Sequence, residues 1–112
     1  MSPLEAYFDE NPEPLKGTLV APKQIIMSSD SQIEIAFKYR TAFFCIANKN
    51  VCYLSINTKG QLYIGFILGY KLQHPSLAVE GRKQIKVYYV DPNEDINLEE
   101  LQEILHEVVA LY

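Results

Sequence analysis

The carboxylates near the start of the chain have a spacing that suits metal chemistry. Glu5, Asp9 and Glu13 lie four residues apart, which would place them on one face of a helix. Carboxylate oxygens bind hard cations such as Fe(II), Mn(II), Ca(II) or Mg(II). Pro12 is expected to end the helix before Glu13, which would break this spacing. A solvated acidic face that keeps the chain soluble is the alternative interpretation.

The cysteines and histidines form no recognised metal or redox motif. Cys45 and Cys52 lack CxxC spacing, and His74 and His106 lie in unrelated segments, so the sequence argues against a zinc site. In the sheet expected below, the two thiols point to opposite faces and should not form a disulfide. Reduced thiols are typical of a cytoplasmic protein.

Motifs for nucleotide or acyl chemistry are absent from the sequence. Gly60, Gly65, Gly69 and Gly81 are spread out and form neither GxGxxG nor GxxxxGK[ST]. No serine lies in a GxSxG elbow, and neither histidine belongs to a recognisable nucleophile–base pattern. We therefore expect that the protein is not an enzyme.

The length and composition predict a single domain over residues 1–112. The chain has 112 residues, of which 48% are hydrophobic and 21% charged, and this is enough to build a core. No stretch approaches the roughly 18 apolar residues of a membrane span, and the beginning lacks a secretory signal pattern. We expect a cytoplasmic protein that does not enter a membrane.

Charge is distributed unevenly along the chain. Residues 1–13 and 91–112 carry eleven of the fourteen acidic residues and no lysine or arginine. The segment between them holds all ten basic residues and three acidic ones, Asp30, Glu34 and Glu80, a net charge of +7. Because the isoelectric point is near 5.1, the sequence argues against a nucleic-acid partner, whose binding depends on phosphate neutralisation.

The expected elements run helix, helix, five strands, helix. Ser2 caps a first helix, and a second helix from Asn11 should be kinked or broken near Pro22, where the backbone donor is missing. A polar loop over 28–31 follows. Alternating or β-rich patterns then predict strands over residues 33–39, 41–47, 51–57, 61–68 and 84–90.

The last helix is predicted to begin after Asn97. Glu100 stands at the capping-box position, and the helix carries a continuous apolar stripe. Glu99, Glu103 and Glu107 repeat the four-residue spacing of acids, with a solvated face again as the alternative to a cation site. This order of elements predicts an α+β, two-layer domain, with the N-terminal helices and the C-terminal helix packed on one face of a five-stranded antiparallel sheet.

Hairpin geometry predicts which residues share a face of the sheet. Two three-residue hairpin loops would place Phe44 opposite Leu54 and Cys52 opposite Phe66, all on the core side.

The other face of the sheet is expected to be exposed, aromatic and comparatively basic. On the last strand, Ile85, Val87 and Tyr89 are expected to face the core, which places Lys86 and Tyr88 on the exposed face. An uncovered aromatic face suggests a contact surface, although tyrosine is also simply favoured in strands, where lysine stems can half cover its ring. The candidate partner-binding residues are Lys38, Phe43, Tyr53, Tyr63, Lys86 and Tyr88.

Several short segments follow one another in a characteristic order and spacing. They are Glu34-Ile35-Ala36-Phe37-Lys38-Tyr39, Phe43-Phe44, Cys52-Tyr53-Leu54, Gly65-Phe66, Gly69, Gly81-Arg82-Lys83 and the capped final helix. Together they resemble the YdhG-like domain family of small bacterial proteins. Ala42 stands where many relatives place proline, which leaves the geometry of the turn at 40–44 open.

The resemblance implies a frataxin-like fold and an iron-handling role of the iron chaperone type. It implies iron binding by Glu5, Asp9 and Glu10 and docking of a partner, such as an iron–sulfur assembly protein, through the sheet. The alternative function is a non-enzymatic module that binds a protein or a small ligand on the exposed aromatic face. Likeness of fold does not by itself transfer function.

Overall fold

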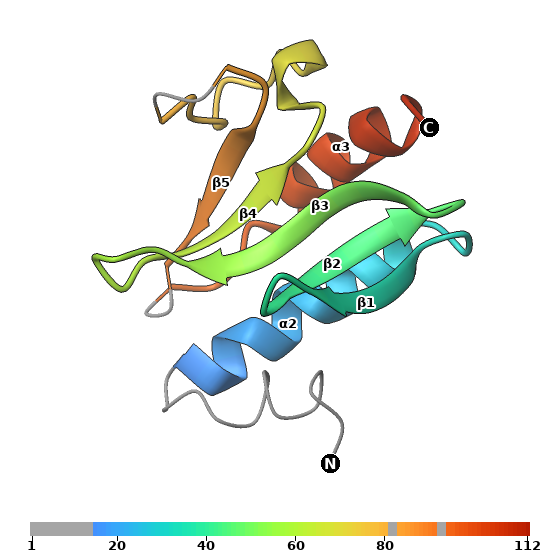
Figure 1. Ribbon diagram of the computed structural model, residues 1–112. Helices are drawn as coiled ribbons and strands as arrows, with labels where there is room; N and C mark the ends of the chain where they lie inside the picture. The colour runs from blue at the N-terminus through green and yellow to red at the C-terminus, as the bar shows by residue number, and fades with distance from the viewer. Residues whose placement is uncertain (1–14, 81–82, 92–93) are drawn as a thin grey trace.

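The computed structural model describes residues 15–80, 83–91 and 94–112 (Figure 1). A helix, α2, precedes a five-stranded antiparallel sheet whose strands are neighbours in chain order, and a second helix, α3, follows it. The elements are α2 (Leu15–Ser29), β1 (Glu34–Lys38), β2 (Thr41–Ile46), β3 (Lys49–Ile56), β4 (Leu62–Phe66), the 3-10 turn η1 (Gly69–Lys71), β5 (Lys86–Val90) and α3 (Leu98–Val109). The helix predicted from Ser2 lies outside the described residues.

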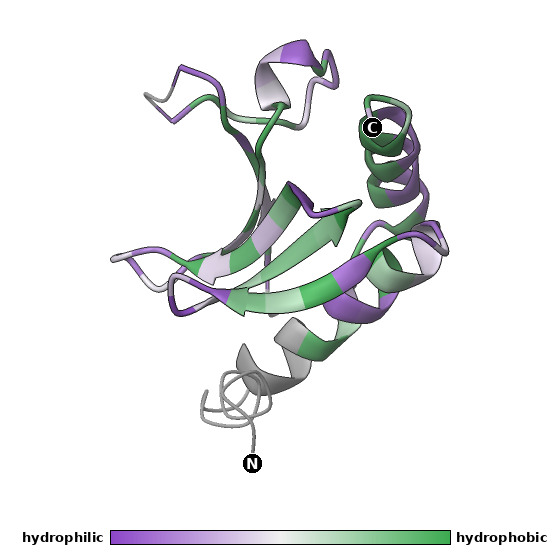
Figure 2. Ribbon diagram, turned by 45° about the vertical axis from the view of Figure 1, so that its right-hand side comes forward, coloured by the Kyte–Doolittle hydropathy of each residue, from purple (hydrophilic) through white to green (hydrophobic). Residues whose placement is uncertain are grey.

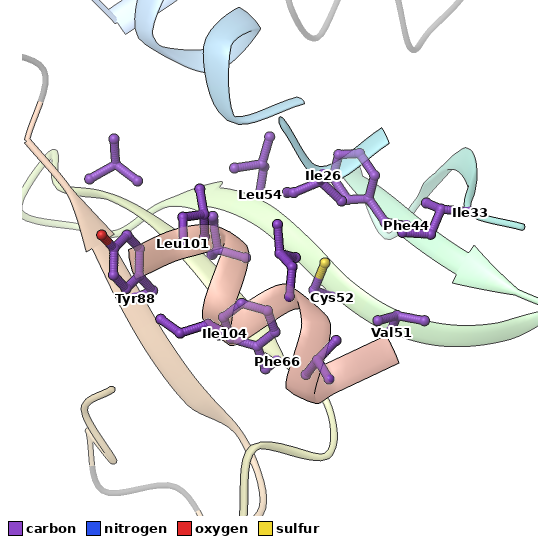
Figure 3. Packing of buried hydrophobic residues seen from close by; sticks show 14 of the residues in the cluster. Ile26, Ile33, Phe44, Val51, Cys52, Leu54, Phe66, Tyr88, Leu101 and Ile104 are labelled. Atoms are coloured by element: carbon purple, nitrogen blue, oxygen red, sulfur yellow. The ribbon is translucent and has the colours of Figure 1, made fainter. Parts of the chain in front are cut away.

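Both described helices lie on the same side of the sheet, as Figure 2 shows, and α3 turns its apolar side toward the strands. Side chains from α2, α3 and the sheet form one buried cluster in which Ile26, Phe44, Leu54 and Leu101 are fully buried (Figure 3). Burying a side chain of this size contributes about 1.5–3 kcal/mol. The predicted α+β class, with a five-stranded antiparallel sheet, is confirmed.

Helix α2 continues through Pro22, so the predicted break there is wrong. Pro22 is buried and is followed one turn later by the fully buried Ile26, and this packing offsets the hydrogen bond that proline cannot donate. The helix also extends to Ser29 and so includes the first two residues of the polar loop predicted over 28–31. The hydroxyls of Ser28 and Ser29 donate to the carbonyls of Ile25 and Ile26, so these serines prolong the last turn of the helix.

The turn between β2 and β3 is shorter than predicted. Its two central residues, Ala47 and Asn48, have φ of 50° and 66°, the left-handed conformation of a tight turn whose twist matches the strands. Phe44 therefore pairs with Cys52 and not with Leu54, and a bulge interrupts the ladder next to Phe44. The shift is two residues, so Phe44 stays on the core side. The predicted pairing of Cys52 with Phe66 is confirmed.

The faces of β5 are the reverse of the prediction. Tyr88 and Val90 join the core under the helices, whereas Val87 packs in a separate cluster on the opposite face. The strand carries apolar residues at both parities, so its periodicity does not decide which face is buried. A backbone bridge between Ala78 and Val87 adds the connection from β4 to β5 (residues 67–85), which we call the crossover, to the edge of the sheet.

Two glycines, Gly65 in β4 and Gly69 at the start of η1, allow close packing. A Cβ on Gly69 would lie 2.2 Å from the backbone nitrogen of Lys86, and one on Gly65 would lie 2.4 Å from Cζ of Tyr53. Hence the tyrosine ring lies directly over Gly65, and the turn at Gly69 passes against the backbone of β5.

Candidate functional site

Aromatic side chains form a continuous row on the sheet face opposite the helices, which we call the outer face. Ring centroids are 5.8 Å apart for Tyr39 and Phe43, 5.3 Å for Phe43 and Tyr53, 5.9 Å for Tyr53 and Tyr63, and 6.3 Å for Tyr63 and Tyr89. Ring pairs at such separations contribute about 0.5–1.5 kcal/mol beyond their buried area. The row is therefore a preorganised part of the sheet, and Phe43, Tyr53 and Tyr63 lie on the face predicted for them.

The middle of the aromatic row is buried, in contrast to the exposed face predicted. Phe43, Tyr53 and Tyr63 are each 8% exposed, because the rings cover one another and the neighbouring apolar side chains of the crossover region pack against them. The two ends of the row are accessible, with Tyr39 84% and Tyr89 38% exposed. A binding partner would meet the ends of the row and not its centre.

Lys86 and Tyr88 lie on the helix side, so their predicted place on the exposed face is wrong. The Lys86 ammonium donates to the carbonyl of Leu72 at 2.7 Å, and the Tyr88 hydroxyl donates to Oε2 of Glu100 at 3.2 Å. Burial and the adjacent Glu100 carboxylate raise the pKa of Tyr88 to about 12. Lys86 therefore links β5 to the residue that follows η1, and Tyr88 links β5 to α3.

Lys38 lies on the outer face, as predicted, and is held in place by polar contacts. Its ammonium donates to Oδ1 of Asn50 at 3.0 Å and lies 3.7 Å from Sγ of Cys45. Both cysteines are free, and Cys45 packs in the outer-face cluster while Cys52 belongs to the core, as predicted. Burial raises the pKa of the Cys52 thiol well above its usual range, which leaves this thiol protonated and unreactive.

A cavity of about 200 Å³ lies at the β5 end of the aromatic row. Its lining consists of Asn57, Tyr63, Glu80, Val87 and Tyr89. The Glu80 carboxylate forms no hydrogen bond or ion pair with any residue in the described ranges. The amide of Asn57 is occupied within its own turn. The cavity thus combines two tyrosine rings, an apolar wall and one carboxylate that is available to a ligand.

Sequence reasoning did not select Glu80 or Tyr89 as site residues. The lining comes from three segments that only the folded sheet brings together, namely the turn after β3, the crossover and the β4–β5 pair. One signal in the sequence could have indicated Glu80, because it is one of only three acidic residues in the otherwise basic middle of the chain.

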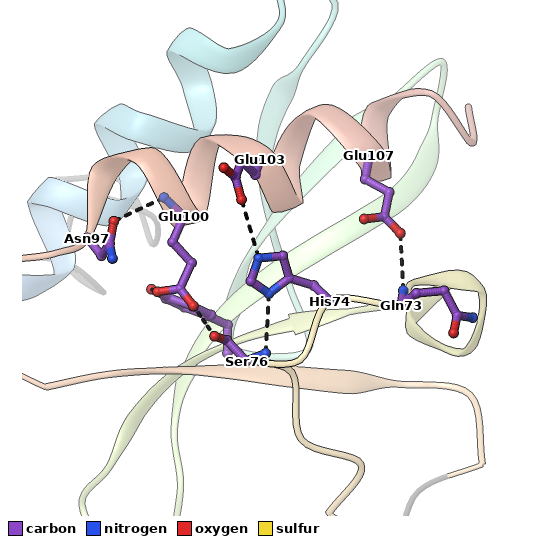
Figure 4. Close-up of polar contacts among 8 residues, drawn as sticks. Gln73, His74, Ser76, Asn97, Glu100, Glu103 and Glu107 are labelled. Carbon is purple, nitrogen blue, oxygen red and sulfur yellow. Dashed lines mark hydrogen bonds and ion pairs between the residues drawn. The ribbon is translucent and has the colours of Figure 1, made fainter.

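A second polar cluster joins the crossover to α3 (Figure 4). Three glutamates of the helix reach this segment. Glu100 accepts from the hydroxyl of Ser76, Glu103 lies 3.5 Å from Nε2 of His74, and Glu107 accepts from the backbone nitrogen of Gln73. The predicted ladder of Glu99, Glu103 and Glu107 is therefore not only a solvated face, since two of its members hold the crossover.

This cluster holds the crossover and does not have the arrangement of a nucleophile and its base. Nδ1 of His74 accepts from the backbone nitrogen of Ser76 at 3.2 Å, and Nε2 faces Glu103. The hydroxyl of Ser76 donates to Glu100 and not to the imidazole. A hydroxyl activated for attack would donate to its base.

The predicted metal ligands Glu5, Asp9 and Glu10 lie outside the described residues. Within residues 15–80, 83–91 and 94–112, no group of three or more histidine, cysteine, aspartate or glutamate side chains is placed to hold a metal ion. Among the same residues, no helix has the length and apolar character needed to span a membrane.

Comparisons with known proteins find no matching family model, no similar curated protein and no similar solved structure. What the chain does must therefore be inferred from its own residues.

Proposed function

We propose that this chain is a non-catalytic binding domain, related to the YdhG-like family, that takes its ligand or protein partner at the outer face. The binding site is the cavity beside Tyr63 and Tyr89. The observation that carries the proposal is the exposed Glu80 carboxylate beside the rings of Tyr63 and Tyr89 in this cavity.

The buried part of the row supports a binding role because it makes the site rigid. Tyr63 is packed between Tyr53 and Tyr89 and is 8% exposed, so ligand binding would not need to order this ring. Sites that are already ordered lose less conformational entropy when they bind. Tyr89, at the accessible end, supplies the apolar and aromatic contact area that is enriched in binding surfaces.

The arrangement of polar side chains supports binding over catalysis. Ser76 and His74 are both engaged by glutamates of α3, and Lys38 by Asn50. Each of these groups ties one part of the fold to another, which is a structural task.

Ligand screening by NMR on the isotope-labelled protein tests the proposed function. Compounds and peptides that shift the ring signals of Tyr63 and Tyr89 should lose affinity in Tyr89→Ala, while the amide spectrum stays that of a folded protein. Tyr70→Ala is the matched control, because Tyr70 is 47% exposed and does not line the cavity. Ligands that bind Tyr89→Ala as well as the unaltered protein would contradict the proposal.

Iron handling is the second candidate function, and it is favoured by the carboxylates at Glu5, Asp9 and Glu10. Their oxygen atoms suit Fe(II), and an iron–sulfur assembly protein would be the partner. An anaerobic Fe(II) titration with Mg(II) as the reference ion tests it. Glu5→Gln with Asp9→Asn should abolish Fe(II) binding, whereas Glu99→Gln with Glu103→Gln should not. Equal affinity in both double variants would exclude this role for the first pair.

A further inference from the structure

The two tyrosines that line the cavity provide an electron-rich wall. Tyr63 and Tyr89 are directly paired across β4 and β5, with ring centroids 6.3 Å apart and ring planes inclined at 60°. The faces of aromatic rings carry partial negative charge and attract cations placed within about 6 Å. A positively charged group in the cavity would be close to both rings.

Glu80 is the only formally charged side chain in the described lining. Its carboxylate has no ionic or hydrogen-bonded partner in the part of the chain that the structure describes. An anionic ligand would be repelled by this group, and a neutral apolar one would strip water from it without compensation. A cation balances the charge of the carboxylate.

The cavity is small and open to solvent on one side, so it holds one small group and leaves the rest of a ligand outside. Its volume of about 200 Å³ lies below the roughly 300–1,000 Å³ of sites that enclose a drug-sized ligand. A head group of a few heavy atoms fits this space, and Val87 offers apolar contact to the carbon atoms attached to it.

We infer that the cavity binds the head group of an organic cation, an ammonium or guanidinium group carried on an aliphatic stem. This inference rests on the proposed function, because it names the chemical class of ligand for the same site. The head group lies against the rings of Tyr63 and Tyr89 and faces the carboxylate of Glu80.

Matched pairs of small probes test the charge requirement. The N-acetyl methylamides of lysine and arginine carry the two cations, and those of norleucine and citrulline are their neutral counterparts. We expect the cationic probes to shift the ring signals of Tyr63 and Tyr89 and to bind at least about threefold more tightly than the neutral ones. Choline is titrated in parallel as a free small cation. A site for a side chain should bind the lysine and arginine probes more tightly than choline, whereas a site for a free small cation should not.

Two matched pairs of variants locate the contacts. Glu80→Gln should weaken binding of the lysine probe about threefold, as expected for one exposed ion pair. Glu99→Gln removes the same charge from α3 at an exposed residue that is not part of the cavity lining, and it should leave the affinity unchanged. Tyr89→Phe keeps the ring and should keep binding, whereas Tyr89→Leu should weaken it about threefold. Amide spectra of each variant establish that it is folded.

The possible results separate this inference from the proposed function. If neutral and cationic probes bind these rings equally, or if Glu80→Gln changes nothing, the cation inference is overturned while the binding site itself stands. If no ligand or probe shifts either ring, both are overturned. Cationic probes that shift only signals of α3 would also overturn the inference, because they would be binding its acidic surface.

Discussion

Replacing Gly65 with alanine should destabilise the protein, and the reason can be tested through Tyr53. A Cβ at this position would lie 2.4 Å from Cζ, 2.5 Å from Cε1 and 2.7 Å from the hydroxyl oxygen of the tyrosine. Non-bonded carbon atoms prefer about 3.5–4.0 Å, so the ring would have to move by roughly 1 Å or more. Phe43 and Tyr63 flank that ring at 5.3 Å and 5.9 Å and restrict its movement.

The expected magnitude follows from two opposing terms. Overpacking of this kind costs about 1–3 kcal/mol, and replacing a glycine inside a strand by alanine recovers about 0.5–1 kcal/mol. Gly65→Ala should therefore lower the free energy of unfolding by about 0–2.5 kcal/mol, with a midpoint of about 1 kcal/mol. In a Tyr53→Ala background the clash is gone, and the same substitution should raise it by about 0.5–1 kcal/mol.

This reversal of sign is measured by urea denaturation followed by far-ultraviolet circular dichroism. The free energy of unfolding is compared among the unaltered protein, Gly65→Ala, Tyr53→Ala and the double variant. Tyr53→Leu serves as the background if Tyr53→Ala is not folded. Gly60→Ala is the control, because Gly60 has φ of 78° and no atom within 4 Å of the added Cβ, so its cost should be equal in both backgrounds. If the effect of Gly65→Ala has the same sign and size with and without the tyrosine ring, to within about 0.5 kcal/mol, the packing explanation is wrong.

Three further predictions concern other parts of the fold. Gly69→Ala should cost more than Gly65→Ala in urea denaturation, because its Cβ would meet the backbone nitrogen of Lys86 at 2.2 Å and a backbone moves less easily than a ring. The pKa values of Tyr88 and Tyr112 are raised from 10 to about 12, chiefly by burial. The stability that these phenols contribute is therefore complete below pH 10 and should be lost as the pH rises to about 12. Asn97→Ala should lower the free energy of unfolding by about 0.5–2 kcal/mol, because the side chain accepts from the backbone of α3.

Each of these predictions has its own control. Gly69→Ala with a stability equal to that of the unaltered protein would contradict the close approach to β5. Tyr88→Phe should remove part of the alkaline loss, and an unchanged pH profile in that variant would assign the loss to other groups. Asn97→Asp should retain the cap, so a loss equal to that of Asn97→Ala would mean that the side-chain bond does not matter.

Local patterns were enough to predict most of the elements. The alternation over residues 33–39 predicted β1, and the capping box at Asn97 and Glu100 predicted the beginning of α3. Both depend on interactions between residues close in the sequence, which the sequence displays directly. The pairing of β3 with β4 was also correct, since the turn at 57–61 is short and contains Gly60 at a positive φ.

The errors arose where several local structures were equally compatible with the sequence. The turn at Ala47 and Asn48 contains no glycine, yet both residues adopt a positive φ, and a residue such as alanine gives no sign of this. On β5 the apolar residues occupy both faces. Its orientation is decided by distant partners, since Tyr88 bonds to Glu100 and Val87 pairs with Ala78.

The cavity could not be predicted for a related reason, because its position depends on how the crossover is held. The bridge from Ala78 to Val87 brings the chain against the outer face immediately before Glu80, and the glutamates of α3 hold the segment around Ser76. These contacts act on the same short stretch from opposite sides of the sheet edge. The position of the Glu80 carboxylate beside Tyr63 is thus set by tertiary contacts of the crossover and not by its local sequence. Because α3 makes some of these contacts, the place of the carboxylate that we assign to ligand recognition also depends on a helix on the opposite side of the sheet.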